Sequence, residues 1–163
     1  LCDSEIILIY GGWVMNVIAL WGRSKVGKTS TLNIVINILI NELGARKRAE
    51  YIAYNKVDTR VVLEINGKII VVFTGGDDRR IMEENFSFVE TQQYDLLICA
   101  CRSKGASCHS IEQRFSKEQI LWFGQSRVSG LDGREEQLKV IRNQENEYLA
   151  KSIVQAAKNI LSI

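Results

Sequence analysis

The chain contains no proline, a single histidine and four cysteines among its 163 residues, and its net charge is only +2. Without proline, it has no proline-rich linker or rigid stalk. A net charge this small gives no reason to expect a nucleic-acid or membrane surface, and no apolar run reaches the roughly 20 residues that cross a bilayer. What remains is an ordinary globular composition, 46% apolar and 25% charged, long enough for one domain with a substantial core.

The cysteines, at positions 2, 99, 101 and 108, do not have the spacing of a secreted disulfide framework, because two of them fall within one apolar run. We therefore expect a reducing, cytoplasmic location. Cys99, Cys101, Cys108 and His109 also fit no common zinc pattern, and small cysteines are frequent in buried strands. Zinc ligation is the less favoured alternative, and we expect His109 to be a surface or helix-cap residue rather than a base.

The most informative stretch is residues 22–29, which read G-x-x-x-x-G-K-T. An apolar run at 17–21 predicts a buried strand before it, and the pattern after it predicts a helix over 28–43 that stops at Gly44. Gly22 lets the chain leave the strand, Gly27 lets backbone approach a phosphate, and the amides between them form a nest for anions at the helix N-terminus. Lys28 is expected to reach the β- and γ-phosphates and the Thr29 hydroxyl to bind Mg²⁺. The predicted nucleotide-binding residues are Gly22, Arg23, Ser24, Lys25, Val26, Gly27, Lys28, Thr29 and Ser30.

This strand, loop and helix resemble the Walker A motif of the P-loop nucleoside-triphosphatase superfamily. The resemblance implies a three-layer α/β fold with a mostly parallel central sheet, one antiparallel hairpin edge and helices on both faces. It also implies a P-loop domain over 15–163, with ATP or another nucleoside triphosphate and Mg²⁺ as ligands. Met15 stands just before the first strand, so we expect either that the native protein starts there or that residues 1–14 form an accessory arm. Within that arm, residues 5–10 are predicted to pair as an extra edge strand.

The rest of the chain alternates between strand and helix patterns. Residues 60–65 and 68–73 flank Asn66-Gly67 and predict an antiparallel hairpin. Further strands are predicted at 95–101 and 119–124, helices at 78–92 and 134–161, and a short helix that carries Ile111 and Phe115. Residues 45–59 are polar and basic and predict a solvated loop.

That loop contains Asn55-Lys56-Val57-Asp58, which matches the N-K-x-D pattern by which GTPases read guanine. In those proteins the pattern follows a late strand, whereas here it precedes the second strand of the expected domain. We therefore interpret the match as accidental.

Ligands of open α/β sheets bind beyond the carboxyl ends of the parallel strands, which nominates the loops at 74–78, 102–104 and 125–127. Asp77 is the predicted acidic partner of the metal, with Thr29, although a threonine and two glycines separate it from its strand. The alternative is that Asp77 or Asp78 caps the next helix. Arg102 is predicted to contact the γ-phosphate, so the expected catalytic residues are Lys28, Asp77 and Arg102.

Three functions follow as hypotheses. The first is Mg²⁺-dependent hydrolysis of a nucleoside triphosphate, with ATP favoured because no guanine-reading element is in place. The second is a kinase that transfers the γ-phosphate to a nucleoside or another small acceptor. The third is a non-catalytic nucleotide switch in which the loops at 45–59 and 74–80 become ordered for an unidentified protein partner.

Overall fold

A computed structural model describes residues 9–10, 13–130 and 133–163 and contains a six-stranded sheet in the order β4-β5-β6-β7-β3-β8. Four neighbouring strands are parallel: β6 (Lys68–Phe73), β7 (Leu96–Arg102), β3 (Val17–Gly22) and β8 (Ile120–Gln125). At one edge β5 (Thr59–Ile65) runs antiparallel to both β6 and the edge strand β4 (Arg46–Ile52). β7 therefore separates β6 from β3, the strand that leads into residues 22–29.

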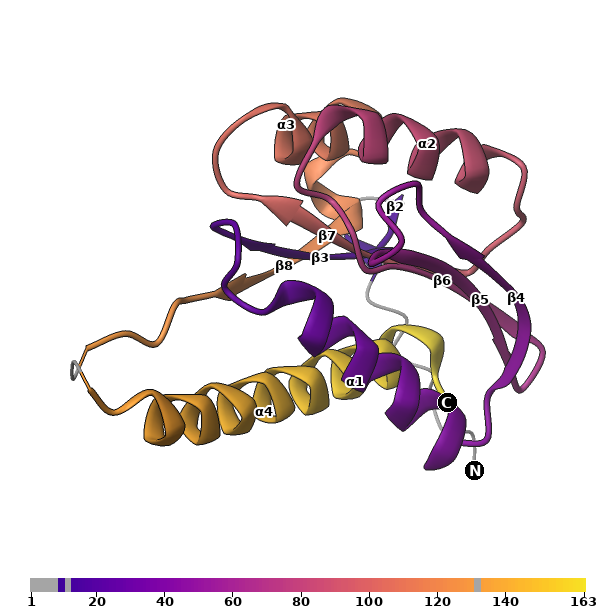
Figure 1. Cartoon of the computed structure of the whole chain (residues 1–163). Helices are drawn as coiled ribbons and strands as arrows, with labels where there is room; N and C mark the ends of the chain where they lie inside the picture. The colour runs from indigo at the N-terminus through magenta and orange to yellow at the C-terminus, as the bar shows by residue number, and fades with distance from the viewer. Residues whose placement is uncertain (1–8, 11–12, 131–132) are drawn as a thin grey trace.

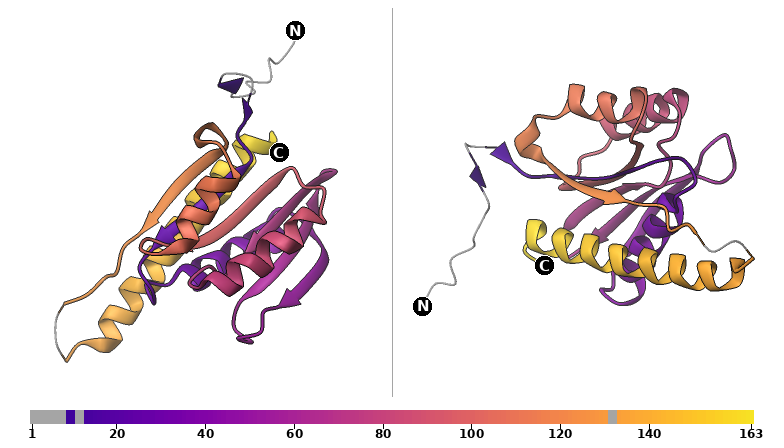
Figure 2. Two further views of the ribbon diagram at one scale, coloured as in Figure 1. Left: turned by 90° about the horizontal axis from the view of Figure 1, so that it is seen from above. Right: turned by 90° about the vertical axis from the view of Figure 1, so that its left-hand side faces the viewer.

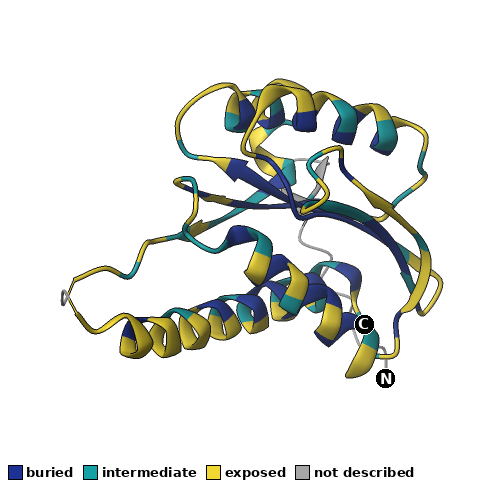
Figure 3. Ribbon diagram, viewed as in Figure 1, coloured by how far each residue is buried: buried dark blue, intermediate teal, exposed yellow. Residues whose placement is uncertain are grey.

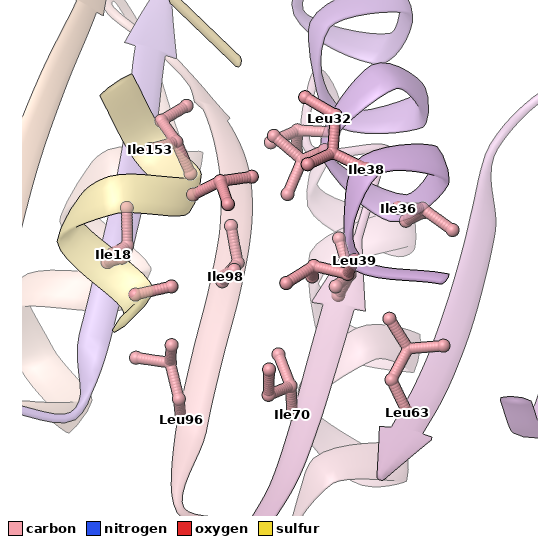
Figure 4. Packing of buried hydrophobic residues seen from close by; sticks show 14 of the residues in the cluster. Ile18, Leu32, Ile36, Ile38, Leu39, Leu63, Ile70, Leu96, Ile98 and Ile153 are labelled. Carbon is pink, nitrogen blue, oxygen red and sulfur yellow. The ribbon is translucent and has the colours of Figure 1, made fainter. Parts of the chain in front are cut away.

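Helices cover both faces of this sheet, as Figure 1 shows. One face carries α1 (Lys28–Asn41) and α4 (Glu135–Leu161), and the other carries α2 (Arg79–Glu90) and α3 (Ala106–Arg114). Alternate residues of β3 supply the two cores: Ile18 and Leu20 pack under α1 and α4, while Val17 and Ala19 pack under α2 and α3. Figure 4 shows the first core, where Leu32 and Leu39 of α1 meet the sheet. The predicted three-layer α/β architecture is confirmed.

The predicted hairpin at Asn66-Gly67 is confirmed. Asn66 and Gly67 have φ angles of 50° and 75°, and Ile65 pairs with Lys68 across the turn. Positive φ at both central residues is what a tight two-residue turn between twisted strands requires, and Asn-Gly meets it at least cost.

The prediction of a loop over 45–59 is wrong for its first half, because β4 occupies Arg46–Ile52. This strand is exposed along most of its length, so it carries no alternating apolar pattern. Its backbone pairs with β5, and on the exposed face Arg46 and Arg48 both contact Glu64 of that strand, at 2.9 and 2.6 Å. The hydrogen bond from Arg46, with the charge of Arg48, lowers the pKa of Glu64. Charged side chains on an edge strand also discourage pairing with other chains.

The helix predictions hold to within a few residues. α1 ends at Asn41 rather than 43, and Asp78 caps α2 by accepting a hydrogen bond of 2.8 Å from the Ile81 amide. Ile111 is buried in α3, whereas Phe115 follows the end of that helix. A short 3₁₀ helix, Lys117–Gln119, leads into β8. Figure 3 shows that the first half of α4 is largely exposed and that its buried residues gather toward its second half.

The expected edge strand at 5–10 lies mostly outside the described residues. Within them, β1 (Ile9–Tyr10) pairs with β2 (Trp13–Val14) in a separate two-stranded sheet, drawn beyond the main sheet in Figure 2. Over the part of the chain that the structure describes, no helix combines the length and apolar character needed to cross a bilayer.

Cys101, at the end of β7, forms a disulfide with Cys108 in the first turns of α3. Sequence spacing did not predict this pair, because the closure depends on how the helix turns back over the strand. The expectation of a reducing location rested on cysteines whose spacing did not indicate disulfides, and this disulfide removes that argument. Cys99 is free and fully buried, and burial raises the pKa of its thiol to about 12.

Reduction of the Cys101–Cys108 bond is expected to lower the free energy of unfolding by about 2 kcal/mol, because the bond closes a short loop and restricts the unfolded chain. Urea unfolding with and without a thiol reductant measures this difference. A Cys101→Ser/Cys108→Ser double variant is the control, and its stability should not respond to the reductant. Equal stabilities of oxidised and reduced wild type would contradict the prediction.

Candidate functional site

Residues 22–29, which we call the glycine loop, connect the end of β3 to the first turn of α1. Gly22 is buried against β8, where a Cβ atom would lie 2.7 Å from the carbonyl oxygen of Gln125. Gly27 has a φ of 107° and Lys25 a φ of 58°, so the loop curls back on itself before the helix begins. Gly22 is thus required by the sheet, and Gly27 by the curl that brings backbone amides to the helix N-terminus.

Lys28 is the most buried charged side chain of this region, with 5% of its surface exposed. Its Nζ donates to the carbonyl oxygens of Gly22 (3.2 Å) and Arg23 (2.8 Å) and lies 3.0 Å from Oδ1 of Asp77. Oδ2 of Asp77 accepts a hydrogen bond of 3.2 Å from the Ser24 hydroxyl. Asp77 therefore lies at the glycine loop, as predicted, but its partners are the ammonium and a serine rather than Thr29.

Thr29 contacts a different carboxylate. Its Oγ1 is 3.1 Å from Oδ1 of Asp58 and 3.3 Å from the carbonyl oxygen of Thr74, so its one proton serves two acceptors. Asn55 positions Asp58: its Nδ2 donates to Oδ2 of Asp58 at 2.6 Å, and its Oδ1 accepts from the Asp58 amide at 3.0 Å.

The segment with the N-K-x-D match, residues 55–58, thus supplies the carboxylate of Asp58 to the site. Its position in the sequence argued against guanine reading, and nothing local indicated that it would fold beside Thr29.

Two glycines precede Asp77 because the chain must pass over the end of β7 to reach the glycine loop. A Cβ at Gly76 would lie 1.9 Å from the carbonyl oxygen of Ala100 in β7, and a Cβ at Gly75 would lie 2.5 Å from the Asp58 side chain. Neither glycine has a positive φ, so the requirement is space and not backbone conformation. The separation of Asp77 from the end of β6 by a threonine and two glycines therefore has a structural cause.

These residues enclose a cavity of about 280 Å³ at the N-terminus of α1. An ammonium and a hydroxyl from the start of α1 face it, with one carboxylate from each of two other segments and backbone of the glycine loop. Such a set can hold an anion through the cation and the amides, and a divalent cation through the hydroxyl and a carboxylate. The lining residues are Lys25, Gly27, Lys28, Thr29, Asn55, Val57, Asp58, Thr74, Gly75, Gly76 and Asp77.

Two amide side chains lie behind the glycine loop: Gln125, which belongs to the nominated loop at 125–127, and Asn146, which was not found from the sequence. Gln125 Nε2 donates to Oδ1 of Asn146 (2.7 Å) and to the carbonyl oxygen of Val26 (3.2 Å), and its Oε1 accepts from Thr31 (3.1 Å). Asn146 is buried in α4, and a Cβ at Gly27 would lie 2.9 Å from its Oδ1. The one sequence signal for Asn146 is that an asparagine occupies the apolar stripe of a helix.

Arg102 does not line this cavity. Its backbone amide donates to the Ser107 hydroxyl at 2.8 Å, and its side chain is exposed. It pairs with Gly22 in the β3–β7 register and so lies at the same edge of the sheet. Its contact with a γ-phosphate stays a prediction.

Comparison with known proteins found no matching family model, no similar curated protein and no similar solved structure. Any function is therefore argued from the geometry above and from the chemistry of these side chains.

Proposed function

We propose that this chain binds a nucleoside triphosphate with Mg²⁺, ATP being the expected nucleotide, and hydrolyses it. The observation that carries the proposal is the convergence of Lys28 and Thr29 with Asp58 and Asp77 on one cavity at the start of α1. These four side chains come from three separate segments, so their meeting is not a property of the glycine loop alone.

Each group has a distinct part in this proposal. The amides of the glycine loop and the N-terminus of α1 bind the phosphate oxygens, and Lys28 exchanges its contact with Asp77 for the β- and γ-phosphates. Thr29 and one carboxylate hold Mg²⁺, which neutralises phosphate charge. Asp77, once released from Lys28, would be free to orient a water molecule at the cavity.

Calorimetry with Mg²⁺ and a non-hydrolysable ATP analogue tests the binding step, and release of inorganic phosphate from ATP tests hydrolysis. GTP in parallel measures the preference for the base. If ATP labelled in its γ-phosphate transfers the label to an added small acceptor rather than releasing it as inorganic phosphate, the kinase alternative is favoured. The absence of binding heat from either nucleotide would contradict the whole proposal.

Two carboxylates of the cavity, Asp58 and Asp77, are candidate ligands of the metal. Comparison of the variants Asp58→Asn and Asp77→Asn shows which of them binds it. Because Asp58 already contacts Thr29, we expect Asp58→Asn to weaken nucleotide binding about tenfold with Mg²⁺ present and to have little effect in a chelator. Asp77→Asn should retain the Mg²⁺ dependence. Titration of the analogue with and without Mg²⁺ measures both, and the reverse pattern would assign the metal to Asp77.

A nucleotide switch is the second candidate, and one observation favours it. The segment that presents Asp58 to Thr29 also carries exposed apolar side chains, Tyr54 (48% exposed) and Val57 (67% exposed). Displacement of Asp58 by the incoming metal and phosphate would move this surface, so a protein partner could sense the bound state. Nucleotide binding without turnover would support this function over hydrolysis.

A further inference from the structure

The Cys101–Cys108 disulfide encloses the turn between β7 and α3, at the same end of the sheet as the glycine loop (Figure 1). Cys101 has no exposed surface, whereas Cys108 is partly exposed. The two cysteines are only seven positions apart in the sequence. Bonds that close short loops stabilise a chain least, and exposed ones are the most readily reduced by thiols. This bond is therefore a candidate for reversible reduction.

The enclosed turn is hydrogen-bonded to the glycine loop. The Ser103 amide donates to the carbonyl oxygen of Gly22 at 3.1 Å, and the same oxygen accepts from Nζ of Lys28 at 3.2 Å. The turn and the lysine thus share one acceptor. Movement of the turn would release the Gly22 carbonyl, and with it one of the contacts that direct Lys28 at the cavity.

A second contact of Lys28 is also next to the disulfide. Asp77 lies 3.0 Å from its Nζ, and a Cβ on the preceding residue, Gly76, would lie 3.1 Å from the Cα of Cys101. The backbone at Cys101 is therefore packed against the segment that carries Asp77. The contacts of the ammonium with Gly22 and with Asp77 both depend on chain that lies within or beside the disulfide loop.

One serine hydroxyl ties the turn to itself independently of the bond. Ser107 is buried, and its Oγ accepts from the Arg102 amide at 2.8 Å and lies 3.4 Å from the Arg102 carbonyl oxygen. Residues 104–106 are exposed, and no described side chain caps the first turn of α3. Ile111 keeps the later part of the helix buried. Reduction would therefore loosen the turn while α3 stays packed on the sheet.

We propose that the Cys101–Cys108 bond regulates the glycine loop, and that its reduction lowers the affinity of the loop for the phosphates of its ligand. In the oxidised form the enclosed turn fixes the Gly22 carbonyl, and Lys28 is held in place before a phosphate arrives. In the reduced form the loop is more mobile and must be ordered when the ligand binds, which weakens binding. This regulation rests on the nucleotide site proposed above.

The reductant is a small dithiol, and the exchange balances without any other reactant. One thiolate of the reagent attacks the sulfur of Cys108, the S–S bond breaks, and Cys101 leaves as a thiolate that takes up a proton. The second thiol of the reagent attacks the mixed disulfide, which releases Cys108 and closes the reagent into a cyclic disulfide. Cys99 does not compete, because burial raises the pKa of its thiol to about 12.

The test uses a Cys2→Ser/Cys99→Ala background, in which Cys101 and Cys108 are the only cysteines left. A mild oxidant and a dithiol prepare the two forms, and mass spectrometry distinguishes them by the two hydrogen atoms that reduction adds. The Cys101→Ser/Cys108→Ser variant should behave as the reduced form does and should not respond to the dithiol.

Amide hydrogen exchange without nucleotide tests the coupling between the bond and the glycine loop. We expect reduction to speed exchange at least about threefold at residues 102–107 and 22–29, as expected where a hydrogen bond is weakened. Residues 62–71, in the part of the β5–β6 hairpin away from the site, are the internal reference and should exchange at the same rate in both forms.

Titration of a non-hydrolysable ATP analogue with Mg²⁺ tests the effect on binding. We expect the reduced form to bind about threefold to tenfold more weakly, the range that corresponds to the loss of one hydrogen bond. Ser107→Ala removes the remaining tie within the turn and should enlarge this difference. Ser152→Ala removes a hydroxyl that bonds only within α4 and should leave the difference unchanged.

Four results would overturn the proposal. They are failure of the bond to form on oxidation; equal exchange at 22–29 in the two forms; faster exchange at 62–71 as well, which would make the bond a general stabiliser of the fold; and equal affinities of the two forms for the analogue. If neither form binds the analogue, the proposed nucleotide site fails, and the exchange at 22–29 still decides whether the bond controls the glycine loop.

Discussion

Lys28→Ala is expected to abolish nucleotide binding, with a loss of at least about 100-fold in affinity. Lys28 is nearly buried and its Nζ is held by two carbonyl oxygens of the glycine loop, so the charge is already directed at the cavity before any phosphate arrives. Each charge-assisted hydrogen bond contributes about 1.5–3 kcal/mol, and the alanine variant loses at least two of them to the phosphates. Calorimetry with Mg²⁺ and an ATP analogue measures the effect.

Lys139→Ala is the matched control, because it removes the same charge from an exposed position on α4. Its affinity should equal that of wild type. Lys28→Ala also leaves Asp77 without its cation, so the double variant Lys28→Ala/Asp77→Asn is needed to show that an unpaired carboxylate is not what repels the nucleotide. Wild-type affinity in Lys28→Ala would remove the proposed function.

Gly76→Ala is expected to cause the largest loss of stability among single substitutions at the site, about 3 kcal/mol or more. The added Cβ would lie 1.9 Å from the Ala100 carbonyl oxygen and 3.1 Å from the Cα of Cys101, and both are backbone atoms of the buried strand β7. Backbone atoms of a buried strand cannot change rotamer as a side chain can, so the loop that carries Asp77 must move away from β7. Urea unfolding measures the stability, and nucleotide titration measures the displacement of Asp77.

Gly44→Ala is the control for Gly76→Ala, because it adds a Cβ to a glycine that has no neighbouring atoms to clash with. Gly44 has a φ of 74° and open space around its position, so alanine there costs only the strain of a left-handed backbone, about 1 kcal/mol. A Gly76→Ala variant that unfolds at the same urea concentration as wild type would contradict the prediction, because it would show that the chain at position 76 has room for a Cβ beside β7.

The elements that sequence patterns predicted well are those with local causes. The helix after the glycine loop follows from apolar periodicity, the β5–β6 turn from Asn66-Gly67, and the start of α2 from the Asp78 cap. In each case the deciding interaction spans only a few residues. β4 escaped prediction because its backbone pairs with a separate strand, β5, and its exposed position leaves its own sequence polar.

The candidate site divides in the same way. By itself the sequence determined the glycine loop, Lys28 and Thr29, because a turn followed by a helix is encoded in eight consecutive residues. Only the tertiary structure decided that Asp58 contacts Thr29, that Asp77 contacts Lys28, and that Gln125 and Asn146 support the loop from behind. These partners come from segments between 29 and about 120 positions away, brought together by a strand order that no local pattern specifies. Side-chain chemistry can be recognised in a few residues, but its geometry depends on how the whole sheet is assembled.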